Sequence, residues 1–240
     1  NLGVVYKDFE KFNTAFDLFD RALSINPEHS TTCYNKAVTL AKIGKFEDAL
    51  AYYRKSLIEK PQHIDTHVNM AMAYHELGEV YKSIKILKEA KKINKDHFMV
   101  LHNWSLQNLL IGNFKEGWEK HEYRWKNEPQ KNIRWPIQDR ELWSGEPDKR
   151  VVIWKEQGIG DDIIFLGLIP EARERCQSLS VFVDPRLKKM CERSIPGVTF
   201  LPNVEALQEE EFDYHIPTGS LPGLMRNDIS DFDRTVKGYL

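Results

Sequence analysis

The chain has 240 residues, enough for one large domain or two small ones with a buried core. Charged residues make up 29% and apolar residues 41%, a globular composition that excludes a disordered chain. A net charge of −2 and the lack of any apolar run near ~20 residues argue against a nucleic-acid partner, an anionic-membrane partner and a membrane span.

Residues 1 to about 126 carry an internal repeat with a period of 34 residues. Several kinds of position stay in register along it. These positions are Asn1, Asn35, Asn69 and Asn103; Gly44, Gly78 and Gly112; Ala15, Ala49, Ser83 and Gly117; and Phe19, Tyr53 and Leu87. The glycines are expected to end one helix and turn the chain, and the small residues to let two helices approach closely.

This pattern resembles the tetratricopeptide repeat, a helix–turn–helix unit, and predicts a helical solenoid of about four units. The first unit is incomplete, because the chain begins in the middle of a helix, and we expect that upstream sequence is missing. In the fourth unit Trp118, Tyr123, Arg124 and Trp125 replace the usual pattern of the second helix. Such a departure is typical of a terminal unit that packs on something other than another repeat.

In such repeats the first helix of each pair lines a concave face, so the resemblance implies a peptide groove. The candidate groove residues are Tyr34, Asn35, Asn69, His75 and Asn103. A row of asparagines can donate to and accept from an extended backbone whatever its sequence, and a similar ladder is known in the repeats of O-GlcNAc transferases. Alternatively, each asparagine satisfies its own repeat. The expected partner is a protein or peptide acceptor.

The spacing of three histidines in the repeats raises the question of a metal site. His63 and His67 are four residues apart, and His75 follows two turns later. Neither a His-Glu-x-x-His motif nor a carboxylate at ligand spacing accompanies them. We therefore predict no metal ion.

Residues 127–149 lose the repeat and hold three prolines, a glycine and two tryptophans. This segment reads as a linker. Exposed tryptophans are costly, so Trp135 and Trp143 are expected to pack on the last repeat, against Trp118, Tyr123 and Trp125. Stacking of one of these rings on a carbohydrate is the alternative.

From residue 150 to 240 the pattern becomes that of an α/β domain. Strands are predicted at 150–154, 179–184, 198–201 and 212–217, and helices at 161–176, 185–195 and from 219 onward. Alternating strands and helices indicate a doubly wound parallel sheet with right-handed crossovers. The fold class is therefore α followed by α/β.

The loop after the first of these strands is the candidate ligand site, since parallel sheets bind ligands beyond the carboxyl ends of their strands. Gly158 and Gly160 would let the backbone approach a ligand. The third glycine of a dinucleotide fingerprint is replaced by Ile163, and no P-loop is present. A carboxylate on this turn can act as a general base. The alternative makes one carboxylate a helix cap and the other a solvated first-turn residue.

Three segments, 142–154, 155–165 and 212–226, look like a bacterial family in which tetratricopeptide repeats precede a glycosyltransferase-like region related to ADP-heptose:lipopolysaccharide heptosyltransferases. The resemblance implies the N-terminal half of a GT-B-like fold, which binds the acceptor. It places the catalytic base at Asp161 and the acceptor loop at Gln157, Gly158 and Gly160. Asp162 stands where relatives often carry another residue and does not inherit that role.

The resemblance also implies what this chain lacks. The half that binds a nucleotide-sugar donor would follow residue 240, so we expect no cofactor in this chain and no catalysis by the chain alone, but a nucleotide-sugar donor for the complete parent. The leading hypothesis is the acceptor-binding portion of a glycosyltransferase. The rival is a non-catalytic scaffold for protein–protein interaction. The glycine pattern argues against a third possibility, that the α/β half binds a nucleotide by itself.

Three widely spaced cysteines favour reduced thiols and a cytoplasmic location. Cys176 and Cys191 fall in apolar helical patterns and are interpreted as core residues.

Overall fold

The computed structural model describes residues 2–126, 140–156 and 158–234. The chain divides into two compact units, 1–111 and 112–240, and each is described by itself. Two residues singled out in the sequence, Trp135 and Gln157, lie outside the described residues. Within the described ranges no helix combines the length and the apolar character that crossing a membrane requires.

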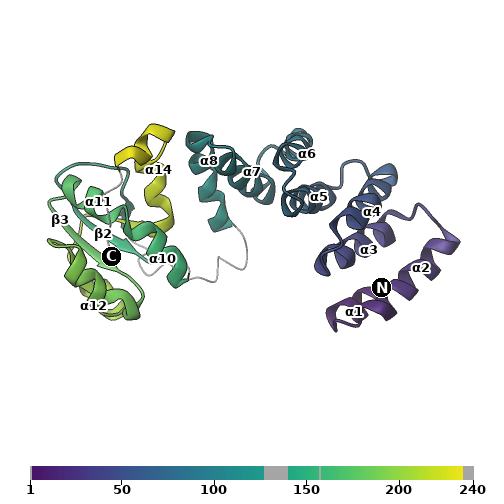
Figure 1. Cartoon of the computed structure of the whole chain (residues 1–240), viewed down its shortest axis with the longest axis horizontal. Coiled ribbons are helices and arrows are strands. Elements are labelled where there is room, and N and C mark those ends of the chain that lie inside the picture. Colours follow the sequence, from purple (N-terminus) through teal and green to yellow (C-terminus); the bar gives the residue numbers. More distant parts are fainter. Residues whose placement is uncertain (1, 127–139, 157, 235–240) are drawn as a thin grey trace. The chain divides into compact units, whose positions relative to one another are not determined.

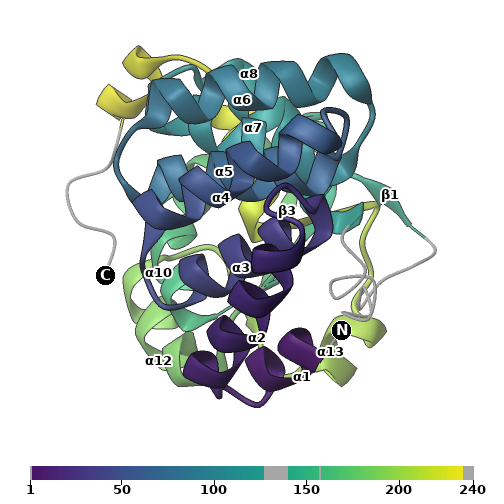
Figure 2. The same ribbon diagram turned by 90° about the vertical axis from the view of Figure 1, so that its right-hand side faces the viewer.

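The first unit is a succession of helices, each packed against its neighbours in the chain (Figures 1 and 2). They are α1 (Leu2–Asp8), α2 (Phe12–Ile25), α3 (Ser30–Lys42), α4 (Phe46–Glu59), α5 (Ile64–Glu76), α6 (Val80–Ile93) and α7 (Phe98–Leu110). Figure 2 shows α4, α5 and α6 next to one another. The predicted helical solenoid is confirmed.

Glycines and small residues produce this packing as the repeat predicts. Gly44 and Gly78 have φ of 77° and 72°, the left-handed conformation that ends a helix without strain in glycine. Ala15, Ala49 and Ser83 are all 0% exposed at the crossings of paired helices. A larger side chain at these three positions would push the helices apart.

A histidine precedes the first helix of each full repeat, a feature that the sequence reading missed. The Nδ1 atom of His29 lies 2.8 Å from the hydroxyl of Thr32, and that of His63 lies 2.7 Å from the hydroxyl of Thr66. In the fourth repeat Val100 takes the place of threonine, and Nδ1 of His97 is buried without a partner among the described residues. Two of the three turns are therefore held by a side-chain bond.

Replacing Thr66 with valine is expected to lower the free energy of unfolding by about 1 kcal/mol, because it keeps the shape and removes the bond to His63. Urea denaturation followed by circular dichroism measures this change. The reverse substitution Val100→Thr gives His97 a partner, and its cost should be smaller than that of Thr66→Val. Equal losses in the two variants would contradict the role of the bond.

The second unit is a five-stranded parallel sheet covered by helices. Its elements are α8 (Phe114–His121), η1 (Glu122–Lys126), β1 (Glu141–Leu142), β2 (Arg150–Trp154), α10 (Ile159–Leu166), α11 (Ile169–Arg175), β3 (Ser178–Phe182), α12 (Pro185–Ser194), β4 (Thr199–Leu201), α13 (Val204–Glu209), β5 (Tyr214–Pro217), η2 (Thr218–Ser220), α14 (Leu221–Met225) and η3 (Ile229–Arg234). The strand order is β1-β5-β2-β3-β4, and each pair of neighbouring strands is parallel. The predicted parallel sheet is confirmed.

Alternate residues of β2 enter two different cores, because successive side chains of a strand point to opposite faces. Val151 and Ile153 belong to the larger core, which also holds Trp143, Cys176 and Cys191. Both cysteines are thus core residues, as predicted. On the other face Val152 and Trp154 pack in a second core, against which Trp125 lies partly buried. The sheet is therefore buried on both faces.

The structure differs from the predicted elements in three places. The predicted helix 161–176 is two helices, α10 and α11, because Pro170 lacks the N–H that would continue the first and suits the first turn of the second. The short strand β1 lies in the predicted linker. The helix α13 was not predicted; its cap is the side chain of Asn203, which accepts from the N–H of Ala206 at 2.8 Å.

Candidate functional site

The strand order places a reversal of direction between β2 and β5. From β2 the chain moves outward through β3 to β4, and then returns to β5 on the other side of β2. In open α/β sheets ligands bind beyond the carboxyl ends of the two strands at such a point. Glu156 follows β2 there, and Thr218–Ser220 follow β5. These segments define the candidate site.

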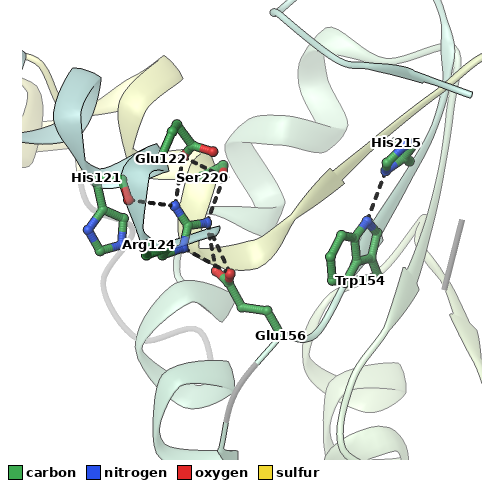
Figure 3. Close-up of polar contacts among 7 residues, drawn as sticks. All are labelled: His121, Glu122, Arg124, Trp154, Glu156, His215 and Ser220. Atoms are coloured by element: carbon green, nitrogen blue, oxygen red, sulfur yellow. Dashed lines mark hydrogen bonds and ion pairs between the residues drawn. The ribbon is translucent and has the colours of Figure 1, made fainter. Parts of the chain in front are cut away.

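A buried arginine from η1 lies at this point (Figure 3). Nε of Arg124 donates to one carboxylate oxygen of Glu156 at 3.0 Å, and Nη2 donates to the other at 3.1 Å. Nη2 also donates to Ser220 at 2.8 Å, and Nη1 to Glu122 at 2.8 Å. The side chains of Arg124 and Glu156 are 1% and 2% exposed. Burial raises the pKa of Glu156, while the guanidinium acts in the opposite direction.

Gly219 leaves the space in which this carboxylate lies. A Cβ atom at this position would fall 1.9 Å from Oε1 of Glu156, and the backbone N–H of Gly219 bonds to the same carboxylate. The buried pair thus joins η1, the end of β2 and the end of β5. The same side chains fill the place in which a ligand of this fold would be expected.

The glycine-aspartate loop begins α10 beside this cluster. Gly158 is the residue before the helix, and Oδ2 of Asp161 accepts its backbone N–H at 3.1 Å. Asp161 is half-buried. It therefore caps the helix with one carboxylate oxygen. Gly160 has open space where a side chain would stand, and Gln157 lies outside the described residues.

Asp162 is not the solvated first-turn residue that one reading of the sequence expected. It is 1% exposed, and its Oδ2 accepts the backbone N–H of Asp184 at 2.8 Å. Its Oδ1 has no hydrogen-bond partner among the described residues. Burial raises the pKa of Asp162. The residue thus ties the start of α10 to the loop before α12.

His215 on β5 is held as a neutral ring by two hydrogen bonds, and Figure 3 shows the one from Trp154. The indole N–H of Trp154 donates to its Nδ1 at 3.0 Å, so the proton is on Nε2, which lies 3.2 Å from the carbonyl of Arg140. Burial lowers the pKa of His215. This histidine fastens β1 to the sheet and is closed to solvent.

The first unit has a cavity of about 540 Å³ on the face formed by the first helices of the repeats. Residues from α1, α3, α4 and α5 line it, and they include Val38, Ala41, Asn69 and Met72. Met72 is 43% exposed. Of the predicted groove residues, this cavity contains Asn69.

The candidate asparagines make different contacts. The amide of Asn69 donates to the hydroxyl of Tyr34 at 3.0 Å, and that of Asn103 donates to the carbonyl of Met99 in its own helix at 2.8 Å. His75 lies 3.2 Å from the amide of Gln107. Asn35 is half-buried. The asparagines therefore do not form a uniform ladder. The amide of Asn103 bonds within its own helix, whereas that of Asn69 bonds to a side chain of the preceding repeat.

Several histidines of the repeats make hydrogen bonds at the start of their own helices. Nδ1 of His67 lies 3.1 Å from the carbonyl of His63, one turn earlier. Across residues 2–126, 140–156 and 158–234, no three His, Cys, Asp or Glu side chains are grouped so that they could hold a metal ion.

Sequence reasoning named Arg124 only as a departure from the repeat and Glu156 only as the start of the loop. One signal could have indicated the pair: Arg124 stands between two aromatic residues, Tyr123 and Trp125, in a segment expected to be buried. A buried arginine requires a carboxylate nearby. Nothing in the sequence specifies that Gly219 borders the same carboxylate.

Comparison with known proteins supports the repeats. A tetratricopeptide repeat model matches residues 44–101. The chain is similar to protein FlbA of Caulobacter vibrioides, with 27% identity over 206 residues, 82% of this chain and 34% of FlbA. The chain thus spans about a third of the length of the curated relative it matches.

Two solved structures are similar to part of this chain. A tetratricopeptide repeat protein from Parabacteroides merdae has 22% identity and a TM-score of 0.50, over 55% of this chain and 52% of that one. A thermophilic repeat protein of Thermus thermophilus has 23% identity and a TM-score of 0.48, over 55% of this chain and 74% of that one. The chain therefore contains tetratricopeptide repeats, and it has a small parallel sheet in its C-terminal part.

Proposed function

We propose that this chain recruits a protein partner to the concave face of its repeats. The observation that carries the proposal is the cavity of about 540 Å³ lined by α1, α3, α4 and α5, with an apolar floor and Asn69 in its wall. Such a surface suits a peptide that buries apolar side chains and bonds its backbone to a few polar groups. Lys42 and Glu76 border the cavity and supply charges of both signs.

The test is a substitution that places a charge on the floor of this cavity. Peptides selected by display on the full chain are expected to bind at least tenfold more weakly to Met72→Glu. The control Tyr81→Glu adds the same charge to α6 at a side chain that is 76% exposed and outside the cavity, and it should bind normally. Equal affinity in both variants would overturn the proposal.

The asparagines provide a second measurement at this face. Asn69→Ala is expected to weaken the same peptides severalfold, because Asn69 lines the cavity, and Asn103→Ala to leave them unchanged, because Asn103 lies outside the cavity. Unchanged binding in Asn69→Ala would make this side chain purely structural, which is the other interpretation of the repeat.

A second candidate function concerns the α/β unit, as the acceptor-binding half of a bacterial glycosyltransferase in the complete parent. The strand order supports it, because it is that of the first half of a doubly wound sheet. The place of Asp161 also supports it, since one carboxylate oxygen caps α10 and the other remains for an acceptor hydroxyl. In this proposal Asp161 is the general base, and Gly158, Gly160 and Gln157 form the loop beside the acceptor.

Asp161→Asn in the full-length parent separates this candidate from a non-catalytic scaffold. Asparagine can still accept the N–H of Gly158, so the helix should remain capped and the midpoint of urea unfolding unchanged. Transfer of sugar from a nucleotide donor should be lost. A parent that transfers sugar equally well with this substitution would refute the assignment of the base, and a parent without any transfer activity would favour the scaffold.

A further inference from the structure

The third repeat carries a concentration of positive charge on its second helix. Residues 80–95, which comprise α6 and the turn after it, hold six lysines and one carboxylate. The lysines are Lys82, Lys85, Lys88, Lys91, Lys92 and Lys95. All but Lys91 are exposed. The other residues of 1–111 hold nine basic and twelve acidic side chains, so the positive charge of this unit is local.

The geometry of the helix places these lysines on its outer face. Leu87 and Ala90 are 0% exposed, on the face of α6 that packs against its neighbours. Lys85, Lys88 and Lys92 recur at intervals of three and four residues, so they lie along one side of the helix over about 10 Å. We call the five exposed lysines the basic face of α6. The cavity of the repeat groove is lined by other helices, α1, α3, α4 and α5.

Carboxylates of the chain neutralise only part of this charge. Lys82 pairs with Glu79, and Lys92 pairs with Glu89 at 2.9 Å. Both pairs join exposed residues three positions apart, and such pairs are weak. Within residues 2–126, 140–156 and 158–234, no carboxylate forms an ion pair with the other four lysines. The basic face therefore keeps a net positive charge.

Two of these four lysines are held by an aromatic ring. Nζ of Lys91 and Nζ of Lys88 lie 4.1 and 5.9 Å from the ring centroid of Trp104 on α7. A cation over an aromatic face keeps its charge while its side chain loses freedom. This contact lowers the ordering cost that a partner would otherwise meet on binding.

Neither the helix dipole nor solubility accounts for the basic face. The dipole favours cations in the last turn of a helix, which contains Lys91 and Lys92. Lys82 and Lys85 lie in the first two turns, where the dipole gives no such gain. Solubility improves as net charge moves away from zero, and in a chain of net charge −2 these lysines bring it closer to zero.

We infer that the basic face of α6 binds a short acidic segment of a protein partner. Ammonium groups attract carboxylates, and such complementarity speeds association and selects the partner. The segment is short, because Glu79 precedes α6 and Asp96 follows Lys95. A nucleic-acid duplex or an anionic bilayer presents its charge over a wider area and would also meet the carboxylates around the helix. The inference does not rest on the repeat groove or on Asp161.

The probe is a fluorescein-labelled octaglutamate peptide, titrated into the full chain at low ionic strength and followed by fluorescence anisotropy. Saturable binding is expected, and added salt should weaken it because the charges are exposed. The double variant Lys85→Glu, Lys95→Glu should weaken it at least about tenfold, since two attractions become repulsions. The control Lys11→Glu, Lys45→Glu changes the net charge equally, at exposed lysines ahead of α2 and α4, and should bind as the unmodified chain does.

Four results would overturn the inference. They are no binding to the unmodified chain, unaltered binding to the double variant, an equal loss in the control, and tighter binding of a DNA duplex or of vesicles containing phosphatidylserine. Self-association that the double variant abolishes, measured by analytical ultracentrifugation, would place a second copy on the face and would also overturn it. Met72→Glu should leave the octaglutamate titration unchanged, which separates this result from that of the repeat groove.

Discussion

The substitution Glu156→Ala is expected to lower the free energy of unfolding of the second unit by about 3–5 kcal/mol. It leaves the guanidinium of Arg124 buried without its carboxylate, and a buried charge that loses its partner is strongly destabilising. It also removes the acceptor for the N–H of Gly219. Urea denaturation followed by tryptophan fluorescence suits the measurement, because five of the six tryptophans lie after residue 112.

Two further variants show whether the buried charge is the cause. Glu192→Ala breaks the exposed pair with Lys188 and should cost less than about 1 kcal/mol. The double variant Arg124→Met with Glu156→Leu removes both charges and should recover a large part of the loss. A loss for Glu156→Ala as small as that for Glu192→Ala would contradict the buried pair.

Gly219→Ala is expected to destabilise the second unit by about 1–3 kcal/mol, since the new methyl group would occupy the place of the Glu156 carboxylate. The carboxylate would have to leave its two bonds with Arg124 to make room. The matched control is Gly223→Ala, whose Cβ has its nearest neighbour at 3.5 Å and should not destabilise α14. The same fluorescence measurement applies.

The two predictions are linked by a double-mutant cycle. With Glu156 already replaced by alanine, the added cost of Gly219→Ala should fall below about 1 kcal/mol, because the colliding carboxylate is gone. Additive losses would show that Gly219 is needed for another reason, such as its own backbone conformation.

The repeats could be predicted from the sequence because their contacts are local and recur. Phe19, Tyr53 and Leu87 share one register position, and all three are buried at the same kind of crossing. The strands of the sheet were found for a related reason: after Arg150 the run at 151–154 is apolar throughout, as is typical of a strand buried on both faces. The two-residue strand β1 was missed, since it gains its place by pairing with Tyr214 and His215, far away in sequence.

The candidate site could be predicted only in part. The loop at residues 158–162 was located by its place after a strand. The hydrogen-bond partners of its two carboxylates differ, however, and this difference depends on tertiary contacts. Asp161 meets the N–H of Gly158 three residues earlier, whereas Asp162 meets that of Asp184, which belongs to another crossover. The contact of Arg124 with Glu156 spans 32 residues, and no local pattern encodes it.

The border between the two units falls inside the fourth repeat, after α7 and before α8. Anyone who wishes to excise the α/β unit by limited proteolysis or by gene truncation must respect this border. A cut after residue 126, where the repeat motif ends, would take Arg124 away from Glu156 and Trp118 away from Arg226. A cut just ahead of Phe114 keeps both attachments, so the last helix of the repeats must stay with the α/β unit.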